Sequence, residues 1–326
     1  MFWLGRCGMA AIQRKSKGNQ VGASVVLGVD GGGTNTRAVL MQGDEVLARA
    51  NGGSIKRLRV GAEQAETSLR GIIRELYAAS GVSRIDAASA GVASASLPGI
   101  KEWIAEVFAE CGVRRSEVVG DEVIALDGAF QGGAGILQIA GTGSNTIGRT
   151  ASGERESAGG YSSTLGDEGS GYWIGLHAIR QGLHAFDRGD ACVILDRVGE
   201  AWGTKTLEEL VNRGNEVPGP DFSQLAPLIA QAGEEGDAVA QWVLDRAAED
   251  IANFILLVRR KLRERRGLVE EVPVAYTGSV LEKIGRVRAR VTELLHGAAP
   301  GMVFRQEPVV AVEGALWRAQ RLAEAE

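Results

Sequence analysis

Short apolar runs alternate with helix-spaced apolar positions along the first part of the chain. The run at 25–30 has the length of a strand, and 37–41 and 45–50 form a predicted hairpin around the Gln-Gly-Asp turn at 42–44. Apolar residues then recur at helical spacing over 62–80, followed by Gly81 as a cap. The later elements are a strand at 85–92, a helix at 98–111, a strand at 117–119 and a helix from 121 to about 131. This order predicts a mixed sheet covered by helices.

The same pattern then starts again. The further elements are strands at 135–140 and 145–148, a turn at Ser152-Gly153, a helical region over 169–266, a strand at 272–276, a helix at 286–296, a strand at 302–305 and a closing helix at 311–325. We therefore predict an internal duplication, with one domain at 22–131 and a second at 132–310. A cleft between two such domains is a usual ligand site.

The predicted first strand leads directly into a glycine-rich turn. Gly31, Gly32 and Gly33 precede Thr34 and leave backbone N–H groups open to an anion, because no Cβ shields them. Asp30 lies among these donors, where it would repel a phosphate unless a cation stood between them. The segment thus favours a metal-bound nucleoside triphosphate, although an ordinary hairpin turn would also use these glycines.

Composition and charge exclude several classes of protein. The net charge of −5 argues against a nucleic-acid surface, and no apolar stretch approaches the roughly 20 residues that span a bilayer. The three cysteines lie far apart without a CxxC pair, so neither a zinc ribbon nor a disulfide framework is expected, and a reduced cytoplasm fits. Basic residues interrupt 1–21, which we interpret as a disordered leader without chemistry rather than a secretory signal.

Four motifs in order resemble the BadF/BadG/BcrA/BcrD ATPase family, within the actin/hexokinase/Hsp70 superfamily. The resemblance covers about residues 25–320, and the third motif is typical of the family's amino-sugar kinases. The motifs are Gly28-Val29-Asp30-Gly31-Gly32-Gly33-Thr34-Asn35-Thr36, Ile139-Ala140-Gly141-Thr142-Gly143-Ser144-Asn145, Gly166-Asp167-Glu168-Gly169-Ser170-Gly171-Tyr172-Trp173-Ile174-Gly175 and Tyr276-Thr277-Gly278-Ser279-Val280. The resemblance implies an α/β fold of duplicated ribonuclease H-like, actin-like ATPase domains with mixed sheets, flanking helices and an inter-domain cleft. It also implies that the closing helix, 311–326, packs back on the first domain.

The resemblance implies an ATP-dependent amino-sugar kinase. Such an enzyme transfers the γ-phosphoryl group of ATP to a hydroxyl of N-acetylglucosamine or glucosamine, for which the unhindered 6-hydroxyl is the expected acceptor. Mg²⁺ would be held at Asp30 largely through water. Many relatives are homodimers, so a homodimer is expected here as well. The implied nucleotide contacts are Gly31, Gly32, Gly33, Thr34, Asn35, Gly141, Thr142, Gly143, Gly278, Ser279 and Val280.

The resemblance also assigns the catalytic base and the sugar contacts. Asp121 is the expected base for the acceptor hydroxyl, with the neighbouring Glu122 side chain pointing away from it. Asp121 could instead be a plain helix N-cap, and Asp167 could likewise only cap the helix that follows it. The implied sugar contacts are Thr142, Gly143, Asn145, Tyr161 and Asp167.

One stretch departs from the family pattern. Lys56 occupies the position where amino-sugar kinases of the family carry a sugar-binding asparagine, and Arg57 and Arg59 follow closely. The three cations could form a solvated basic turn. Alternatively, Lys56 or Arg57 could contact an anionic substituent of the sugar, such as the lactyl carboxylate of N-acetylmuramate or a phosphate.

Two other functions remain open from the sequence. The same family includes ATPase activators of 2-hydroxyacyl-CoA dehydratases and benzoyl-CoA reductases, which hold a [4Fe–4S] cluster between two subunits. Clusters need cysteine thiolates close together, whereas Cys111 and Cys192 are far apart in the sequence. A non-catalytic ATP-binding regulator is the other possibility, although it would need neither Asp121 nor Asp167.

Overall fold

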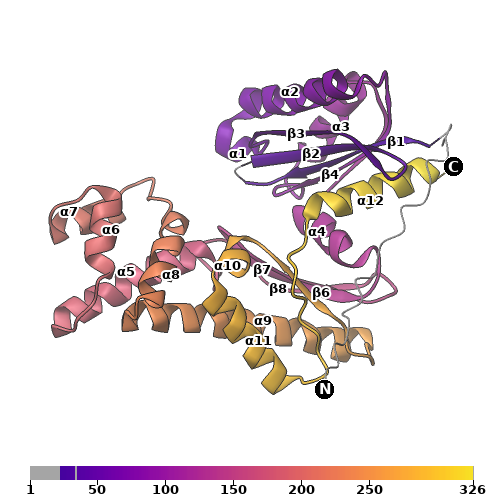
Figure 1. The fold of residues 1–326 in the computed structure, drawn as a ribbon. Helices are drawn as coiled ribbons and strands as arrows, with labels where there is room; N and C mark the ends of the chain where they lie inside the picture. The colour runs from indigo at the N-terminus through magenta and orange to yellow at the C-terminus, as the bar shows by residue number, and fades with distance from the viewer. Residues whose placement is uncertain (1–22, 34, 326) are drawn as a thin grey trace, which may run out of the picture.

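The computed structural model describes residues 23–33 and 35–325. Two separate sheets divide the chain, as Figure 1 shows. We call the five-stranded sheet with its helices the N-terminal lobe, and the four-stranded sheet with its helices the C-terminal lobe. The predicted fold, with two mixed sheets flanked by helices, is confirmed. The expected leader at 1–21 and the Thr34 contact lie outside the described residues.

The N-terminal sheet has the order β3-β2-β1-β4-β5. The strands β1, β2 and β3 form an antiparallel meander, and β4 and β5 continue it in parallel with β1. The elements are β1 Val25–Gly31, β2 Asn35–Gln42, β3 Glu45–Gly53, α1 Arg57–Val60, α2 Ala62–Ser80, β4 Ile85–Val92, α3 Ile100–Glu110, β5 Val113–Val119 and α4 Asp121–Phe130.

Alternate residues of β1 face opposite sides of this sheet. Leu27 belongs to the core that α2 and α3 form with one face, whereas Val26 packs with Val312 and Leu316 of α12 (Ala311–Glu324) on the other face. The last helix of the chain therefore covers the first sheet, as the yellow helix in Figure 1 shows.

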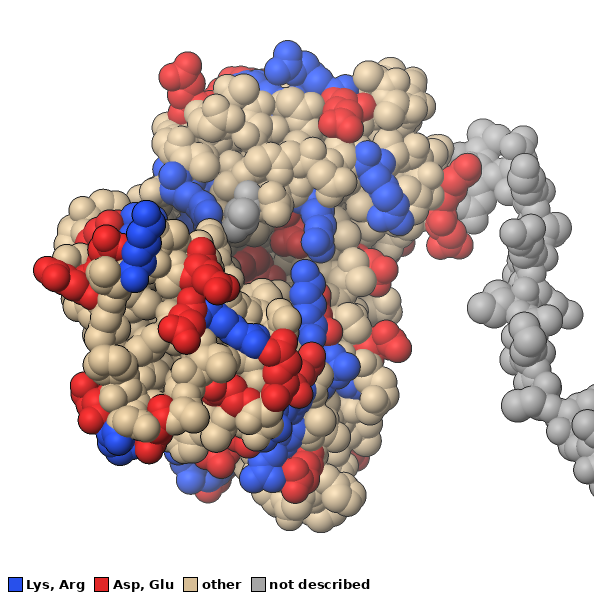
Figure 2. All heavy atoms as spheres, turned by 60° about the vertical axis from the view of Figure 1, so that its left-hand side comes forward, with Lys and Arg blue, Asp and Glu red and all other residues tan. Residues whose placement is uncertain are grey.

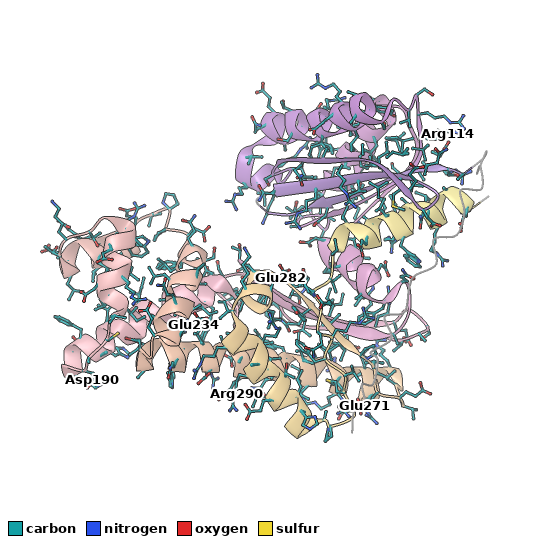
Figure 3. All side chains as sticks on the ribbon, in the orientation of Figure 1. Arg114, Asp190, Glu234, Glu271, Glu282 and Arg290 are labelled. Carbon is teal, nitrogen blue, oxygen red and sulfur yellow. The ribbon has the colours of Figure 1, made fainter. Side chains whose placement is uncertain are left out.

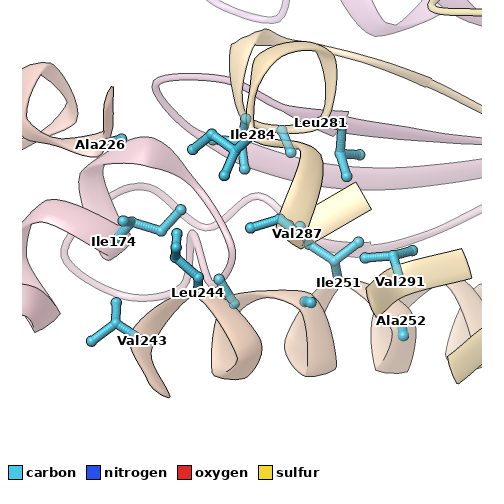
Figure 4. Packing of buried hydrophobic residues seen from close by; sticks show 14 of the residues in the cluster. Ile174, Ala226, Val243, Leu244, Ile251, Ala252, Leu281, Ile284, Val287 and Val291 are labelled. Atoms are coloured by element: carbon cyan, nitrogen blue, oxygen red, sulfur yellow. The ribbon is translucent and has the colours of Figure 1, made fainter. Parts of the chain in front are cut away.

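The C-terminal sheet has the order β8-β7-β6-β9, with β6 parallel to β9 and antiparallel to β7. Its core lies between the sheet and the helices, where Ile251 and Leu244 of α9 meet Ile174, Ile284 and Val287 (Figure 4). The elements are β6 Gly135–Ala140, β7 Ser144–Arg149, β8 Arg155–Gly159, α5 Gly171–Arg188, α6 Ile194–Trp202, α7 Leu207–Gly214, the 3₁₀ helix η1 Phe222–Leu225, α8 Ala226–Glu234, α9 Ala238–Arg266, β9 Val274–Thr277, α10 Ser279–Lys283 and α11 Gly285–Ala298.

The helices α4 and α12 connect the two lobes. Leu126 and Ala129 of α4 pack on the second sheet, while α12 packs on the first. The helices touch through backbone at Gly314, because a Cβ there would lie 1.8 Å from the Ile124 carbonyl oxygen and 2.3 Å from the Gly128 nitrogen. Glycine is therefore required for this close helix contact.

A buried ion network also joins the lobes. Asp127 of α4 is fully buried and accepts hydrogen bonds from Arg149 of β7 at 2.5 Å and from Arg318 of α12 at 2.7 Å. Arg318 in turn forms a bidentate pair with Glu117 of β5 at 2.7 and 2.8 Å. Both sheets and both connecting helices therefore contribute to one set of paired charges.

Some predicted elements differ from the structure. The strand expected at 302–305 is wrong: the described chain has only an isolated parallel bridge between Val274 and Phe304 there. The Pro308 region follows directly, and its backbone turns toward α12 instead of extending the sheet. The strand expected at 117–119 is longer, from Val113 to Val119, and the turn at Ser152-Gly153 leads into β8, which the pattern did not reveal.

Candidate active site

The carboxyl ends of β1, β4 and β5 lie together at one edge of the N-terminal sheet, because these neighbouring strands are parallel. Asp30 and Gly31 end β1, and Gly120 and Asp121 follow β5. Ligands of such sheets commonly bind outside the carboxyl ends of the strands. The topology thus places the predicted metal carboxylate and the predicted base at the same edge.

A serine hydroxyl holds the first glycine loop, residues 31–33. Ser54, at the end of β3, donates its hydroxyl hydrogen to the Gly33 carbonyl oxygen at 3.0 Å and accepts the backbone N–H of Lys56 at 3.1 Å. Gly31 has no room for a side chain, since a Cβ would lie 2.5 Å from Val92 Cγ1 and 2.7 Å from Ile55 Cδ1. Asn35 is exposed at the start of β2.

Asp121 is the first residue of α4, and Gly120 is its N-cap. The Asp121 carboxylate accepts the N–H of Glu122 at 3.1 Å and caps no later turn, so the interpretation of Asp121 as a plain N-cap is wrong. Burial raises the pKa of Asp121 to about 7, with further contributions from the charges of Glu122 and Asp30. A carboxyl group that is half-ionised near neutral pH is well suited to accept a proton from an alcohol.

The Glu122 side chain lies beside Asp121, so the prediction that it points away is wrong. A Cβ built on Gly120 would lie 2.2 Å from Oε2 of Glu122 and 2.3 Å from its Oε1. The Glu122 carboxylate therefore folds back over Gly120, and its charge and hydrogen bonding both raise the pKa of Asp121. The missing side chain of Gly120 makes this position accessible.

The second glycine loop, residues 141–143, follows β6 of the C-terminal lobe and is held by backbone contacts. Its Gly141 carbonyl oxygen accepts the N–H of Gly171 at 2.7 Å, and its Thr142 carbonyl oxygen accepts the N–H of Tyr172 at 3.3 Å. Gly278, after β9, lies against it so closely that a Cβ would be 2.4 Å from the Ala140 oxygen. The predicted phosphate loop thus meets the start of α5 and the predicted adenosine loop.

A buried polar cluster supports the strands of this loop. Gln138 donates to the hydroxyl of Ser144 at 3.1 Å and accepts a hydrogen bond from Thr146. All three side chains are buried. The sequence analysis missed this cluster, although the three polar residues at alternating positions in otherwise apolar strands were a usable signal.

Most predicted sugar contacts come together around the second glycine loop. The Asp167 carboxylate lies 3.0 Å from the position of a Cβ on Gly143, and the Asn145 side chain lies 3.0 Å from that of a Cβ on Gly160. The side chain of Tyr161 is 69% exposed in the loop that joins them. These groups form one polar surface beside the loop.

Asp167 does not cap the following helix, so the capping alternative is wrong. Ser170 caps α5 instead, because its hydroxyl accepts the N–H of Trp173 at 3.0 Å. Burial raises the pKa of Asp167, while a hydrogen bond from the Ser144 backbone opposes this shift. The carboxylate is half-buried and available to a ligand.

The predicted adenosine loop lies at the start of α10. The backbone N–H of Gly278 donates to Glu282 at 2.8 Å, and Glu282 lies on the side of the C-terminal lobe that faces the N-terminal lobe in Figure 3. Ser279 is exposed, whereas the Val280 side chain is buried in the core. Any nucleotide contact of Val280 would therefore involve its backbone.

A hollow lies where the upper and lower halves of the molecule meet. Figure 2 shows acidic side chains at its bottom and Lys or Arg side chains on both of its sides. Burial raises the pKa of Asp30, and Arg37 partly opposes this shift. Because the charge of Asp30 also raises the pKa of Asp121, a cation bound beside these carboxylates would relieve their repulsion.

Lys56 and Arg57, two of the three cations in the stretch that departs from the family pattern, have different surroundings in the structure. The Arg57 guanidinium stacks 3.9 Å above the Trp103 ring centre, and its buried Nε has no hydrogen-bond partner among the described residues. Lys56 is half-buried next to Ser54, and its ammonium group forms no hydrogen bond or ion pair within the described part of the chain. Lys56 is therefore the more available of these two cations.

Comparisons with known proteins place this geometry in context. The N-acetylmuramic acid/N-acetylglucosamine kinase of Clostridium acetobutylicum is 31% identical over 233 residues, which are 69% of this chain and 76% of that protein. The N-acetyl-D-glucosamine kinase of Dictyostelium discoideum is 27% identical over 282 residues, 80% of this chain and 86% of that protein.

A solved structure agrees with these relatives. The proposed N-acetylglucosamine kinase of Chromobacterium violaceum superposes with a TM-score of 0.70 at 26% identity, covering 90% of this chain and 98% of that one. The family model of the BadF/BadG/BcrA/BcrD ATPase family matches residues 27–317. The predicted resemblance is therefore confirmed, and the chain belongs to the BadF/BadG/BcrA/BcrD ATPase family.

Proposed function

We propose that the protein is an ATP-dependent kinase that phosphorylates a hydroxyl group of an amino sugar. The observation that carries this proposal is the half-buried Asp121 carboxyl, whose pKa is raised to about 7 at the sheet edge that also carries the first glycine loop. The curated relatives support the same chemistry, since both are named as kinases of N-acetylated sugars. ATP is the phosphoryl donor expected of an ATPase family.

In this proposal the acceptor hydroxyl gives its proton to Asp121 as its oxygen attacks the γ-phosphorus. Backbone N–H groups of the two glycine loops, 31–33 and 141–143, would hold the phosphates from both sides. No group of three or more His, Cys, Asp or Glu side chains suited to a metal ion occurs in the part of the chain that the structure describes. Asp30 would therefore hold Mg²⁺ through water, and the ion would neutralise phosphate charge when bound.

The acceptor sugar is proposed to lie against the surface around the second glycine loop. Asp167 and Asn145 would share hydrogen bonds with neighbouring ring hydroxyls or an N-acetyl group, and Thr142 and Gly143 would add backbone contacts. Tyr161 would cover an apolar face of the ring. The 6-hydroxyl, the homodimer and the cytoplasmic location stay predictions. No described helix is both long and apolar enough to cross a membrane.

The reaction is tested by ADP release from MgATP with a panel of amino sugars. We expect sugar-dependent release, and at least a 100-fold loss of kcat in Asp121→Asn, because general-base catalysis contributes about 10²–10⁴-fold. The rate with the native protein should fall as the pH drops through about 7, since protonated Asp121 cannot accept a proton. The proposal would be contradicted if the rate of ADP release did not depend on the sugar, or if the Asp121→Asn variant kept the native kcat.

Asp121→Asn should also make the free protein more stable at pH 8. A carboxyl group whose pKa is raised on folding favours the folded state only while it is protonated, so its ionisation between about pH 4 and 7 costs stability. A higher Tm together with lost activity would show that the variant is folded. Thermal unfolding at pH 8 therefore serves as the control for the activity assay.

Lys56 is proposed to favour acceptors that carry an anionic substituent. Its ammonium group forms no hydrogen bond or ion pair with the described residues, and its backbone N–H is bound to Ser54, whose hydroxyl contacts the first glycine loop. These observations support the proposal, as does the relative named for N-acetylmuramic acid. We expect Lys56→Met to lower kcat/KM for N-acetylmuramate about 10-fold and to leave that for N-acetylglucosamine within about twofold, as for one charge-assisted hydrogen bond.

Arg57→Met is the matched control for this experiment, because Arg57 is stacked on Trp103. It should change both sugars alike. Equal losses for the two sugars in Lys56→Met would contradict a contact with the anion. Native rates for both sugars in that variant would instead favour a solvated basic turn.

The activator function receives less support from the structure. Cys111 packs with the core of the N-terminal lobe and Cys192 with that of the C-terminal lobe. Burial raises the pKa of both thiols, which disfavours the thiolate form that binds a cluster. Iron analysis of anaerobically purified protein separates the two functions, because a stoichiometric cluster would contradict the kinase.

A further inference from the structure

Two carboxyl groups share the N-terminus of α4. The Glu122 carboxylate occupies the space that a side chain of Gly120 would fill, with both oxygens within 2.3 Å of the ideal Cβ position. Its charge and hydrogen bonding both raise the pKa of Asp121, and the Glu122 N–H donates to the Asp121 carboxylate at 3.1 Å. The Glu122 side chain thus folds back over Gly120 instead of extending into solvent from the first turn of the helix.

The pair lines a cavity of about 460 Å³ that runs beside α4. The cavity includes the segment after β4, residues 93–96, but neither glycine loop. Asp121 and Glu122 both line this cavity, and its segment after β4 lies next to the first glycine loop, because the Ala93 N–H donates to the Gly31 carbonyl oxygen at 3.4 Å. The other charged groups that line the cavity are Lys101 of α3, Arg149 of β7, Arg155 of β8 and Arg318 of α12.

These cations do not form ion pairs with the two carboxyl groups. Arg149 and Arg318 are bound to Asp127, and Arg318 also to Glu117. Asp30 of β1 adds a further negative charge near Asp121. The electrostatic environment of Asp121 is thus dominated by carboxylates, and Glu122 is the nearest of them in the chain.

We propose that Glu122 is a positioning residue of this active site, whose carboxylate, held beside Asp121 in the space left by Gly120, makes Asp121 a stronger base toward the acceptor hydroxyl. The proposal rests on the kinase function proposed above. A neighbouring negative charge favours the protonated form of a carboxyl group, so the pair holds a proton more readily than Asp121 alone. A stronger base accepts the hydroxyl proton more completely in the transition state.

The first test is Glu122→Gln, which keeps the size of the side chain and removes its charge. In the pH profile of kcat/KM, we expect the midpoint of the acidic limb to shift to a pH about one unit lower, as for the loss of a like charge at close range. The variant should then be about threefold slower than the native enzyme at pH 8.5 and about threefold faster at pH 5.5. A structural defect would lower both rates, so this crossing is specific to the proposed role.

The second test is Gly120→Ala, which removes no titratable group. Gly120 has φ −66° and ψ 150°, a conformation open to alanine, and its new Cβ would push the flexible Glu122 carboxylate out of place. We expect the same downward movement of the acidic limb. The double variant Gly120→Ala/Glu122→Gln should show no further movement, because both changes remove one interaction.

Glu102→Gln is the matched control, since Glu102 also lies in the first turn of a helix in the same lobe. It should keep the native pH profile. A native profile in both Glu122→Gln and Gly120→Ala would overturn the proposal. Carbon-13 NMR titration measures the pKa of the Asp121 carboxyl group without turnover. A lower pKa in both variants supports the pairing of the two carboxyl groups, even if no sugar is phosphorylated. The absence of sugar phosphorylation would overturn only the kinase function.

Discussion

The two lobes share one strand order but complete it differently. In each sheet an antiparallel hairpin leads from the inner strand to the edge, and a parallel strand adds to the other side, giving β3-β2-β1-β4 and β8-β7-β6-β9. The N-terminal sheet then gains β5, from Val113 to Val119. At the equivalent place in the C-terminal sheet there is only the bridge between Val274 and Phe304.

The two lobes also differ in the connection from the third strand of each sheet to the fourth in chain order, β3 to β4 and β8 to β9. In the N-terminal lobe α1 and α2 alone separate β3 from β4, whereas the helices α5 to α9 separate β8 from β9. The predicted sugar-binding carboxylate, Asp167, precedes the first of those helices. In the proposed function, the C-terminal lobe would therefore use its longer connection for substrate contacts, whereas the extra strand of the N-terminal lobe leads directly to Asp121.

The glycine loops at the ends of β1 and β6 differ in how they are held. Backbone groups of Gly171 and Gly278 contact the second loop on two sides. The carbonyl oxygen of Gly33 in the first loop accepts the hydroxyl of one side chain, Ser54. The second loop is therefore held by main-chain contacts from both Gly171 and Gly278, whereas the first loop combines one main-chain contact, from the Ala93 N–H to the Gly31 carbonyl oxygen at 3.4 Å, with the replaceable Ser54 hydroxyl.

The largest expected effect is that of Gly278→Ala. Its φ of 103° is unfavourable for alanine, and the added Cβ would lie 2.4 Å from the Ala140 oxygen and 2.8 Å from the Gly141 nitrogen. Because backbone cannot move away as a side-chain tip can, we expect a loss of about 3 kcal/mol in the free energy of unfolding. Urea denaturation measures this loss, and the ATP KM should rise in whatever folded protein remains.

Gly33→Ala in the first loop is the corresponding control. A Cβ there meets no atom within 4 Å, so the free energy of unfolding should change by less than about 1 kcal/mol. Similar losses in the two variants would remove the contrast between the loops. A stable Gly278→Ala variant would show that the second loop is not fixed by its backbone contacts.

The sequence predicted the order of most elements because their signals are local. Helix α2 and its cap Gly81 follow from periodicity within one segment, and so does β1 before the glycine run. The residues 302–305 were misassigned since an apolar run of that length fits a strand or a single bridge equally well. Pairing depends on the partner strand and on the turn toward α12, which no local pattern contains.

The sequence predicted those residues of the candidate site that belong to recognisable motifs. Asp121 and Asp167 were found through the resemblance, and the structure places each in a partly buried polar setting. The side-chain direction of Glu122 was not predictable, because it depends on the space above Gly120. The Asp127 network was also missed, since its partners Arg149 and Arg318 are brought together only by the crossing of α4 and α12.

The smallest expected effect, and the sharpest test of the contrast between the loops, is that of Ser54→Ala. Ser54 is 5% exposed, and its replacement removes the hydroxyl that donates to Gly33 and accepts from Lys56. One net hydrogen bond contributes about 1 kcal/mol, so the free energy of unfolding should fall by about that much. The ATP KM should rise about threefold, because the first loop keeps its sequence but loses its support.

Ser68→Ala in the same lobe is the control for this variant, since the Ser68 hydroxyl accepts only an exposed contact from Gln64 at 3.4 Å. It should leave both the stability and the ATP KM unchanged. If Ser54→Ala cost as much stability as Gly278→Ala, the first loop would be as firmly held as the second. An unchanged ATP KM would instead mean that Ser54 stabilises the end of β3 and not the nucleotide contact of the first glycine loop. The supports of the two loops would then differ only in how much they contribute to stability.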